Sequence, residues 1–251
     1  MYNLKGRKVL VTGGARGIGA AIVRKFAAEG SDIAINYLNS QDAAASLAKE
    51  MQDEYGINTT IIQGDMSRMA DCKALVKRSI EVLGGLDVII SNAGNTKIAP
   101  FEDIYALSEE DWDHAHNVLT KSNIFLLQEA LPTFNANPDG GVLLIMSSLA
   151  GLITNGSSLA YSVHRAAQLQ LTQCLAQTHG PKVRVNAVCP GLVDTDRTAV
   201  FSEERRNLYK EMAVMKRITT QEEVADTFIY LAKNSGLTGE RIRVDSGMAI
   251  R

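Results

Sequence analysis

Short apolar runs alternate along this chain with longer stretches in which apolar residues recur every three or four positions. The first run, 8–11, stops at a glycine-rich turn, after which Ile18, Ile22 and Phe26 fall at helical spacing. This pattern predicts a strand, a turn and a helix. The same alternation predicts further strands over 33–35, 60–62, 88–90, 142–146, 183–188 and 242–244, and further helices over 41–54, 71–83 and 109–131.

The predicted strands are almost uniformly apolar. A strand without a polar face is buried on both sides, which is typical of a parallel sheet covered by helices on both faces. The sequence therefore predicts an α/β fold with a doubly wound, seven-stranded parallel sheet in a three-layer αβα arrangement. Because no linker rich in Pro, Gly or Ser interrupts the alternation, we expect a single domain over residues 1–251.

One long interval between strands invites two interpretations. Residues 196–220 contain a charged cluster at 203–206, followed by Met212, Val214 and Met215. The interval is either an ordinary solvated helix or a mobile lid over a substrate pocket, and the sequence leaves both open.

The composition excludes several classes of protein. Hydrophobic residues make up 45% of the 251 residues and charged residues 22%, which excludes a disordered or fibrous chain. Lys and Arg total 26 against 28 Asp and Glu, so the net charge of −2 gives no field that favours nucleic acid or an anionic membrane surface. Three widely separated cysteines show no zinc-ligand spacing, so we expect no metal site and a cytoplasmic location.

Glycines cluster where the first predicted strand meets the first predicted helix. The segment 12–19 reads TGGARGIG. Glycines at such a turn permit positive φ angles and let the main chain approach a pyrophosphate, whose charge the helix N-terminus stabilises. The position of this cluster at a strand-turn-helix junction therefore indicates a dinucleotide site.

The spacing TGxxxGxG resembles that of the short-chain dehydrogenase/reductase family, and four further motifs follow in the family's order. They are Asp65 after the third predicted strand, an Asn-Ala-Gly triplet at 92–94, Ser148 thirteen residues before Tyr161, and a loop at 190–195 similar to the family's nicotinamide-binding loop. The resemblance covers nearly the whole chain and implies a Rossmann-type fold. It also implies cofactor contacts from the following residues: Gly13, Arg16, Gly17, Ile18, Gly19, Asn36, Tyr37, Asp65, Met66, Asn92, Ala93, Gly94, Tyr161, Arg165, Pro190, Gly191, Val193 and Thr195.

The second predicted strand indicates which dinucleotide the chain prefers. A ribose 2′-hydroxyl is usually held by an acidic residue about twenty positions beyond the glycines, whereas a 2′-phosphate needs that acid absent and a cation nearby. This strand ends in Asn36 and Tyr37 without a carboxylate, and Arg16 can hold a phosphate with its planar guanidinium. NADP(H) is therefore favoured over NAD(H), although Leu38 stands where many NADP-preferring relatives carry a second basic residue.

The implied catalytic set is atypical. In the family that the motifs resemble, a tyrosine donates the proton, a serine binds the carbonyl oxygen, a lysine follows the tyrosine by four residues, and an asparagine lies on the preceding helix. Ser148 and Tyr161 match the first two roles, but Arg165 occupies the lysine position and Leu119 the asparagine position. Arginine keeps the positive charge, yet it cannot readily release a proton.

Histidines near these positions are weaker candidates. His114 and His116 flank position 119 and are candidates for replacing the missing proton relay, although side chains two apart on a helix point in different directions. His164 lies four residues after Ala160 on the predicted helix, and we expect it to be a packing or interface residue.

Three interpretations of function stay open. The protein is an NADP(H)-dependent oxidoreductase that reduces a carbonyl or imine with Ser148, Tyr161 and Arg165, or a scaffold repurposed for isomerisation, dehydration or cyclisation, or a catalytically weak partner subunit. The resemblance also implies a homo-oligomer, a dimer or tetramer. It places the substrate pocket near 95–100, 153–156 and 212–215, where Ile and Met indicate a largely apolar small molecule.

Overall fold

The structure, a computed structural model, describes residues 2–195, 198 and 201–250. Seven parallel strands form one sheet in the order β3-β2-β1-β4-β5-β6-β7. The predicted seven-stranded, doubly wound parallel sheet is therefore confirmed. The strands are β1 (Lys8–Val11), β2 (Asp32–Tyr37), β3 (Thr59–Gln63), β4 (Val88–Ser91), β5 (Gly141–Met146), β6 (Val183–Pro190) and β7 (Arg241–Val244).

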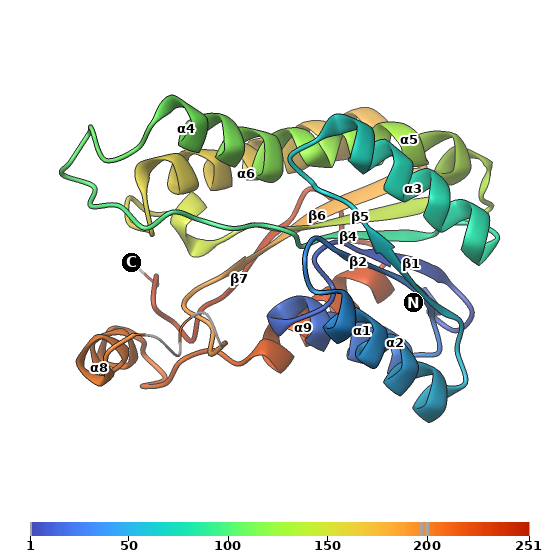
Figure 1. Ribbon diagram of the computed structural model, residues 1–251, viewed down its shortest axis with the longest axis horizontal. Helices are drawn as coiled ribbons and strands as arrows, with labels where there is room; N and C mark the ends of the chain where they lie inside the picture. The colour runs from blue at the N-terminus through green and yellow to red at the C-terminus, as the bar shows by residue number, and fades with distance from the viewer. Residues whose placement is uncertain (1, 196–197, 199–200, 251) are drawn as a thin grey trace.

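Helices cover both faces of the sheet, as Figure 1 shows, with α1, α2 and α9 on one face and α3, α5 and α6 on the other. This gives the three αβα layers predicted from the apolar strands. The α-helices are α1 (Gly17–Ala28), α2 (Gln41–Tyr55), α3 (Met69–Leu83), α4 (Glu109–Ala115), α5 (Ser122–Ala136), α6 (Leu159–His179), α8 (Glu203–Met212) and α9 (Gln221–Lys233).

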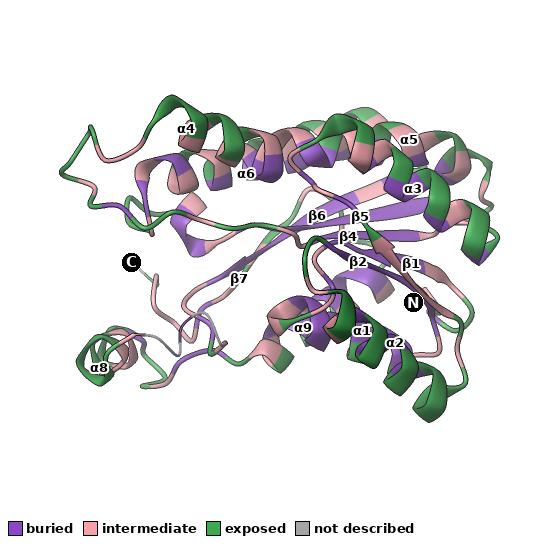
Figure 2. Ribbon diagram, viewed as in Figure 1, coloured by how far each residue is buried: buried purple, intermediate pink, exposed green. Residues whose placement is uncertain are grey.

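The sheet separates two apolar cores. Every residue of β2 and of β5 is buried, and Figure 2 shows the buried strands enclosed by helices whose outer faces are exposed. Phe26 and Phe228 lie in the core on the α1 and α9 side, whereas Leu126 and Phe134 lie in the core beneath α3, α5 and α6. Burial from both sides is the reason that these strands carry no alternating polar positions.

The segment predicted as one helix over 109–131 differs from the prediction. It consists of α4, a π-helical turn η1 (His116–Lys121) and α5, which continues to Ala136. A π-turn holds more residues than an α-turn, and the apolar spacing of the sequence gives no sign of it. A capping box formed by Ser108 and Asp111 explains why α4 begins at Glu109.

The strand order reverses between β1 and β4, which lie side by side although β2 and β3 separate them in sequence. In an open parallel sheet, ligands bind at the carboxyl ends of the strands beside such a reversal. The glycine turn follows β1, the Asn-Ala-Gly triplet follows β4, and Ser148 follows β5. The fold therefore brings the motifs of the sequence to one edge.

Only part of the interval 196–220 is described, because residues 196–197 and 199–200 lie outside the described residues. The described part contains α8, which begins after Ser202, whose hydroxyl accepts a hydrogen bond from the Arg205 N–H (3.2 Å). Across the described chain, no helix has both the length and the apolar character needed to cross a membrane.

A charged side chain from β6 caps the C-terminal end of α9. Arg184 on β6 is half-buried, and its guanidinium donates hydrogen bonds of 2.7–3.3 Å to the carbonyl oxygens of Leu231, Ala232, Asn234 and Leu237. A cation at this position satisfies carbonyls that the helix leaves unpaired and interacts favourably with the helix dipole.

Replacing Arg184 with Met is therefore expected to destabilise the protein by about 2–4 kcal/mol, because buried carbonyl groups lose charged donors. The measurement is the free energy of unfolding from denaturant titration. Arg78, which forms an exposed pair with Glu81, serves as the matched control, and Arg78→Met should change that free energy by less than about 0.5 kcal/mol. Equal effects of the two substitutions would contradict the capping role.

Candidate active site

The glycine turn has the geometry of a phosphate cradle. Gly13 (φ +60°) and Gly17 (φ +55°) adopt the left-handed conformation that favours glycine. A Cβ on Gly19 would collide with the carbonyl oxygen of Gly13 and lie 2.7 Å from Nδ2 of Asn92. The helix α1 begins at Gly17, so its free N–H groups are available to an anion above the turn.

Two asparagines hold this turn in place. Asn92 donates through Nδ2 to the carbonyl oxygens of Thr12 (2.9 Å) and Gly13 (3.1 Å). Asn36, which is buried, accepts the Gly13 N–H at 3.0 Å and donates to the carbonyls of Ile62, Gly64 and its neighbour Tyr37. The side chain of Asn36 therefore uses both of its polar atoms within the protein.

Beside the turn lies the first cavity, which we call the cofactor cavity, with a volume of about 470 Å³. Most of the residues predicted to contact the cofactor line it, namely Gly13, Arg16, Gly17, Ile18, Gly19, Asn92, Ala93, Gly94, Tyr161, Arg165, Pro190, Gly191, Val193 and Thr195. Met146, Ser147, Leu192 and Thr198 line it too and were not predicted. The rule that ligands meet the carboxyl ends of parallel strands would have found Met146 and Ser147 at the end of β5.

Four residues of the prediction do not line this cavity. Both polar atoms of the Asn36 side chain already bond main-chain groups of the protein, and Tyr37 and Met66 are buried. The carboxylate of Asp65 accepts the Ser67 N–H at 2.8 Å. Asn36 and Tyr37 are the last residues of β2, and Asp65 and Met66 follow β3; relative to β4, both strands lie beyond β1 in the sheet.

Ser148 and Tyr161 stand between two cavities. The Tyr161 main chain is held by the N-cap of α6, since its N–H donates to Oγ of Ser158 (3.4 Å), and Ser148 Oγ accepts the Ala150 N–H (3.1 Å). Both side chains line the cofactor cavity and also a second cavity of about 250 Å³, which we call the substrate cavity. Gly191, in the loop after β6, also lines both cavities.

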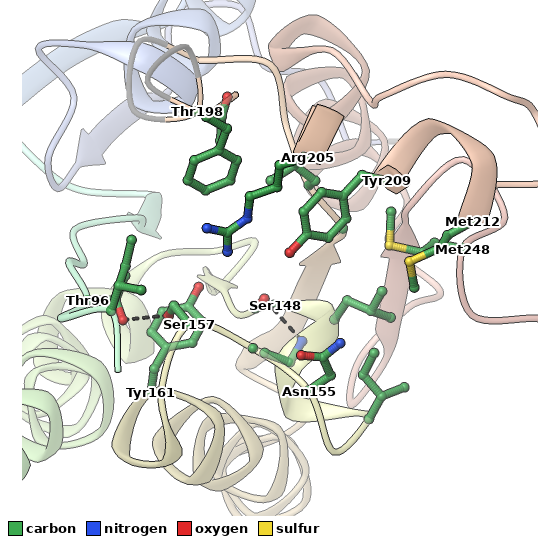
Figure 3. A pocket seen from close by; sticks show the side chains of 18 residues that line it. Thr96, Ser148, Asn155, Ser157, Tyr161, Thr198, Arg205, Tyr209, Met212 and Met248 are labelled. Carbon is green, nitrogen blue, oxygen red and sulfur yellow. Dashed lines mark hydrogen bonds between the residues drawn. The ribbon is translucent and has the colours of Figure 1, made fainter. Parts of the chain in front are cut away.

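The substrate cavity receives side chains from several segments, shown in Figure 3. Ile98, Ile153 and Met212 come from the three segments predicted to line it. Arg205 and Tyr209, which the prediction did not include, project from α8 into the same space. Apolar side chains and hydroxyl groups make up most of the wall.

Arg165 lies inside the protein, with only 5% of its surface exposed. Its Nη1 donates to the carbonyl oxygen of Met146 and to Oε1 of Gln168 (3.0 Å), and its Cζ lies 4.8 Å from the centre of the Tyr161 ring. Its Nε is buried without a hydrogen-bond partner among the described residues. A cation over the Tyr161 ring stabilises negative charge on the phenol oxygen and also holds the ring through a cation–π contact.

Leu119, which the motifs predict at the asparagine position, lies next to Gly94 and Arg165. It lies in η1, 1% exposed, and a Cβ on Gly94 would lie 3.1 Å from its Cδ2 and 2.9 Å from Nη2 of Arg165. Asn123 turns back on its own helix, where Nδ2 donates to the carbonyl oxygen of Leu119 (2.7 Å). An apolar side chain therefore fills the space beside Arg165.

The histidines lie beside this centre. His114 hydrogen-bonds Oδ1 of Asn95 (2.9 Å) and lines a small polar cavity that Tyr161 also reaches. His164 hydrogen-bonds the Thr120 hydroxyl (3.2 Å) and packs against His116, and burial together with that neighbour lowers its pKa. His164 thus has the packing role that was predicted.

Two further groups limit the chemistry of the site. Burial raises the pKa of the Cys189 thiol to about 12, although Arg165 acts in the opposite direction, so this cysteine is a neutral core residue and not a nucleophile. Among the described residues, no three His, Cys, Asp or Glu side chains are grouped so that they could hold a metal ion.

Comparison with known proteins places this geometry in a family. A family model described as enoyl-(acyl carrier protein) reductase matches residues 13–249. The chain is 33% identical to the 3-oxoacyl-[acyl-carrier-protein] reductase FabG of Aquifex aeolicus, over 98% of both chains. It is also 30% identical to a blue fluorescent protein from a metagenomic library, crystallised with NADPH, with a TM-score of 0.90 over 99% of this chain and 100% of that one.

A short-chain dehydrogenase from Burkholderia cenocepacia, crystallised with NADP, has a TM-score of 0.89 and 29% identity over 98% of this chain and 99% of that one. The matches to these relatives cover the sheet, the glycine turn and α6 together. The chain therefore belongs to the short-chain dehydrogenase/reductase family of oxidoreductases.

Proposed function

We propose that the protein is an NADP(H)-dependent oxidoreductase that reduces a carbonyl or imine of a largely apolar small molecule. The observation that carries this proposal is the position of Ser148 and Tyr161, which line the cofactor cavity and the substrate cavity at once. A group bound in one cavity meets a group bound in the other at these two side chains. Such a boundary suits transfer between a cofactor and a substrate held in contact.

The glycine cradle fits a dinucleotide, since Gly13 and Gly17 adopt positive φ angles and the first N–H groups of α1 are available to a pyrophosphate. NADP(H) is favoured because Arg16 is exposed beside the turn and no carboxylate ends β2. Two similar structures carry NADPH or NADP, which supports the same choice. When bound, the cofactor supplies a hydride to the carbonyl or imine carbon.

The residues of the chain supply the proton and the orientation. Ser148 Oγ donates a hydrogen bond to the substrate oxygen or nitrogen, and Tyr161 gives its phenolic proton to that atom as the carbon is reduced. Arg165 stabilises the resulting phenolate from the face of the ring. Since a guanidinium does not deprotonate, Tyr161 regains its proton from solvent and not from Arg165.

Arg165 has a second role in this proposal. Its Nη1 is used by Met146 and Gln168, but Nη2 lies beside Gly94 at the wall of the cofactor cavity and Nε has no partner among the described residues. These donors suit the ribose hydroxyls of the cofactor.

We further propose that the described part of the interval 196–220 forms a lid over the substrate cavity, and that the chain is a single domain. No residue of α8 is buried, yet Arg205, Tyr209 and Met212 face the substrate cavity, which favours a cover over the cavity and not a solvated helix alone.

The assembly is proposed to be a homo-oligomer, a dimer or tetramer, since α5 and α6 expose Ile124 and Val163.

One observation favours a second function. Arg165 cannot pass on a proton, and the space beside it is filled by Leu119, so the polar relay of typical relatives is missing. A non-redox reaction such as isomerisation, dehydration or cyclisation would need Tyr161 and Ser148 only as an acid–base pair. Product analysis by mass spectrometry beside NADPH absorbance separates the two, since only the reductase consumes cofactor in step with product.

Tyr161→Phe is expected to lower kcat for NADPH-dependent ketone reduction at least about a hundredfold, because the proton donor is lost while the ring remains. NADPH binding, measured by fluorescence titration, should stay within about threefold of the unchanged protein, because packing is preserved. Tyr55→Phe, at the exposed end of α2, is the matched control. Full activity of Tyr161→Phe would refute the assigned role.

Arg16→Ala is expected to weaken NADPH binding roughly tenfold or more while changing NADH binding little, because only NADPH carries the 2′-phosphate. The measurement is the dissociation constant of each cofactor by calorimetry. Arg24→Ala, on the outer side of the same helix and paired with Glu50, is the control. An equal loss of affinity for NADPH and NADH would show that Arg16 does not bind the 2′-phosphate.

Arg165→Lys is expected to lower kcat about tenfold or more, because one ammonium cannot replace the bonds to Met146 and Gln168 and the contact with Tyr161. Adding Leu119→Asn should recover part of the loss, since both side chains occupy the space beside Gly94. A double-mutant cycle on kcat measures this coupling. Additive losses would mean that the two positions act independently.

A further inference from the structure

The substrate cavity contains one charged side chain among the described residues that line it, and this side chain is the cation of Arg205. The remaining described lining residues are apolar, carry a hydroxyl or, at Asn155, an amide. Because the rest of this wall is uncharged, the cation determines which ligand charge the cavity favours.

The fold directs Arg205 into the cavity. Its Cζ lies 4.2 Å from the centre of the Phe201 ring, a cation–π contact that fixes the side chain. Figure 3 shows the guanidinium directed from α8 toward the space between Tyr161 and Ser148. The Tyr209 hydroxyl, one helical turn farther along α8, is directed into the same space.

Arg205 also lacks a counter-ion within the described part of the chain, in contrast to its neighbour. Arg206 bonds the carboxylate of Asp194 (2.9 Å) and the carbonyl oxygen of Thr198 (3.3 Å), and so anchors α8 to the loop after β6. No ion pair joins Arg205 to any described Asp or Glu. Arg206 therefore anchors the helix, whereas the guanidinium of Arg205, an exposed residue, has no carboxylate partner among the described residues.

A ligand that fills the cavity removes water from this guanidinium. Desolvating a cation without a partner is unfavourable, whereas a carboxylate on the ligand restores the interaction as a charge-assisted, bidentate hydrogen bond. Tyr209 adds a hydroxyl donor beside it. An uncharged ligand receives no such compensation.

We infer that the substrate carries an anionic group, a carboxylate on a short apolar chain, which Arg205 and Tyr209 bind while the carbonyl lies at Ser148 and Tyr161. This inference rests on the proposed reductase function and names its substrate class, an oxo acid. A phosphate on a thioester carrier is also negatively charged, but a cavity volume of about 250 Å³ favours a small acid.

The test compares each acid with its neutral ester, using levulinate and methyl levulinate, and para-acetylbenzoate and its methyl ester. With NADPH, kcat/KM for the acid should exceed that for the ester in the unchanged protein. In Arg205→Met this acid-to-ester ratio should fall at least about tenfold, mainly through KM, whereas Arg205→Lys should keep part of it. Lys210→Met, on the same helix but outside the cavity wall, should leave the ratio unchanged.

Acetoacetyl-coenzyme A and the neutral acetoacetyl thioester of N-acetylcysteamine distinguish the source of the charge. Dependence on Arg205 for the coenzyme A thioester alone would overturn the oxo-acid inference in favour of a carrier phosphate. Equal kcat/KM for acids and esters in the unchanged protein would overturn any anion site. In that case, reduction of the esters would still leave the proposed reductase function intact.

Binding gives a readout that does not need turnover. Calorimetry of the NADP⁺ complex should show para-acetylbenzoate binding more tightly than its methyl ester, with the difference lost in Arg205→Met and kept in Lys210→Met. If no ketone is reduced but this difference is present, the anion site stands while the reductase function fails. If the acid and the ester bind equally, the anion site is refuted.

Discussion

The active site depends on the hydrogen bonds that tie the glycine turn to the strands on either side. Asn36 on β2 holds the Gly13 N–H, and Asn92 after β4 holds the carbonyl oxygens of Thr12 and Gly13. A turn built from glycines has no side chains of its own to pack, so these amides supply its rigidity. A turn fixed in this way holds the N-terminus of α1 in one orientation. The residues that follow β5 and β6 lie around the same site.

The fold could be predicted because its cause is visible in the sequence. Strands buried on both faces are almost uniformly apolar, and the glycine turn and the triplet at 92–94 come where strands end. The role of Asn36 could not be predicted, because a polar residue at the end of β2 suits a cofactor contact as well as a contact with the main chain. Its partners are peptide groups, which are the same at every position and leave no sign in the sequence.

The charged lining of the substrate cavity also could not be predicted from the sequence. Arg205 and Arg206 are neighbours within one charged cluster, and by composition the two are equivalent. Successive residues on a helix point about 100° apart, so the fold directs one guanidinium to Asp194 and the other into the cavity. The distinction between an anchoring charge and a binding charge comes from the direction of α8, which spacing alone does not determine.

Arg165 and Leu119 pack beside the same glycine. Arg165 reaches past the Tyr161 ring to the Met146 carbonyl, and its Nη2 shares the space beside Gly94 with Leu119. A polar side chain at position 119 would require its own hydrogen-bond partner in a place that is 1% exposed, whereas leucine requires only contact. Leu119 and Arg165 therefore share one buried space beside Gly94, so a substitution at either position changes the surroundings of the other.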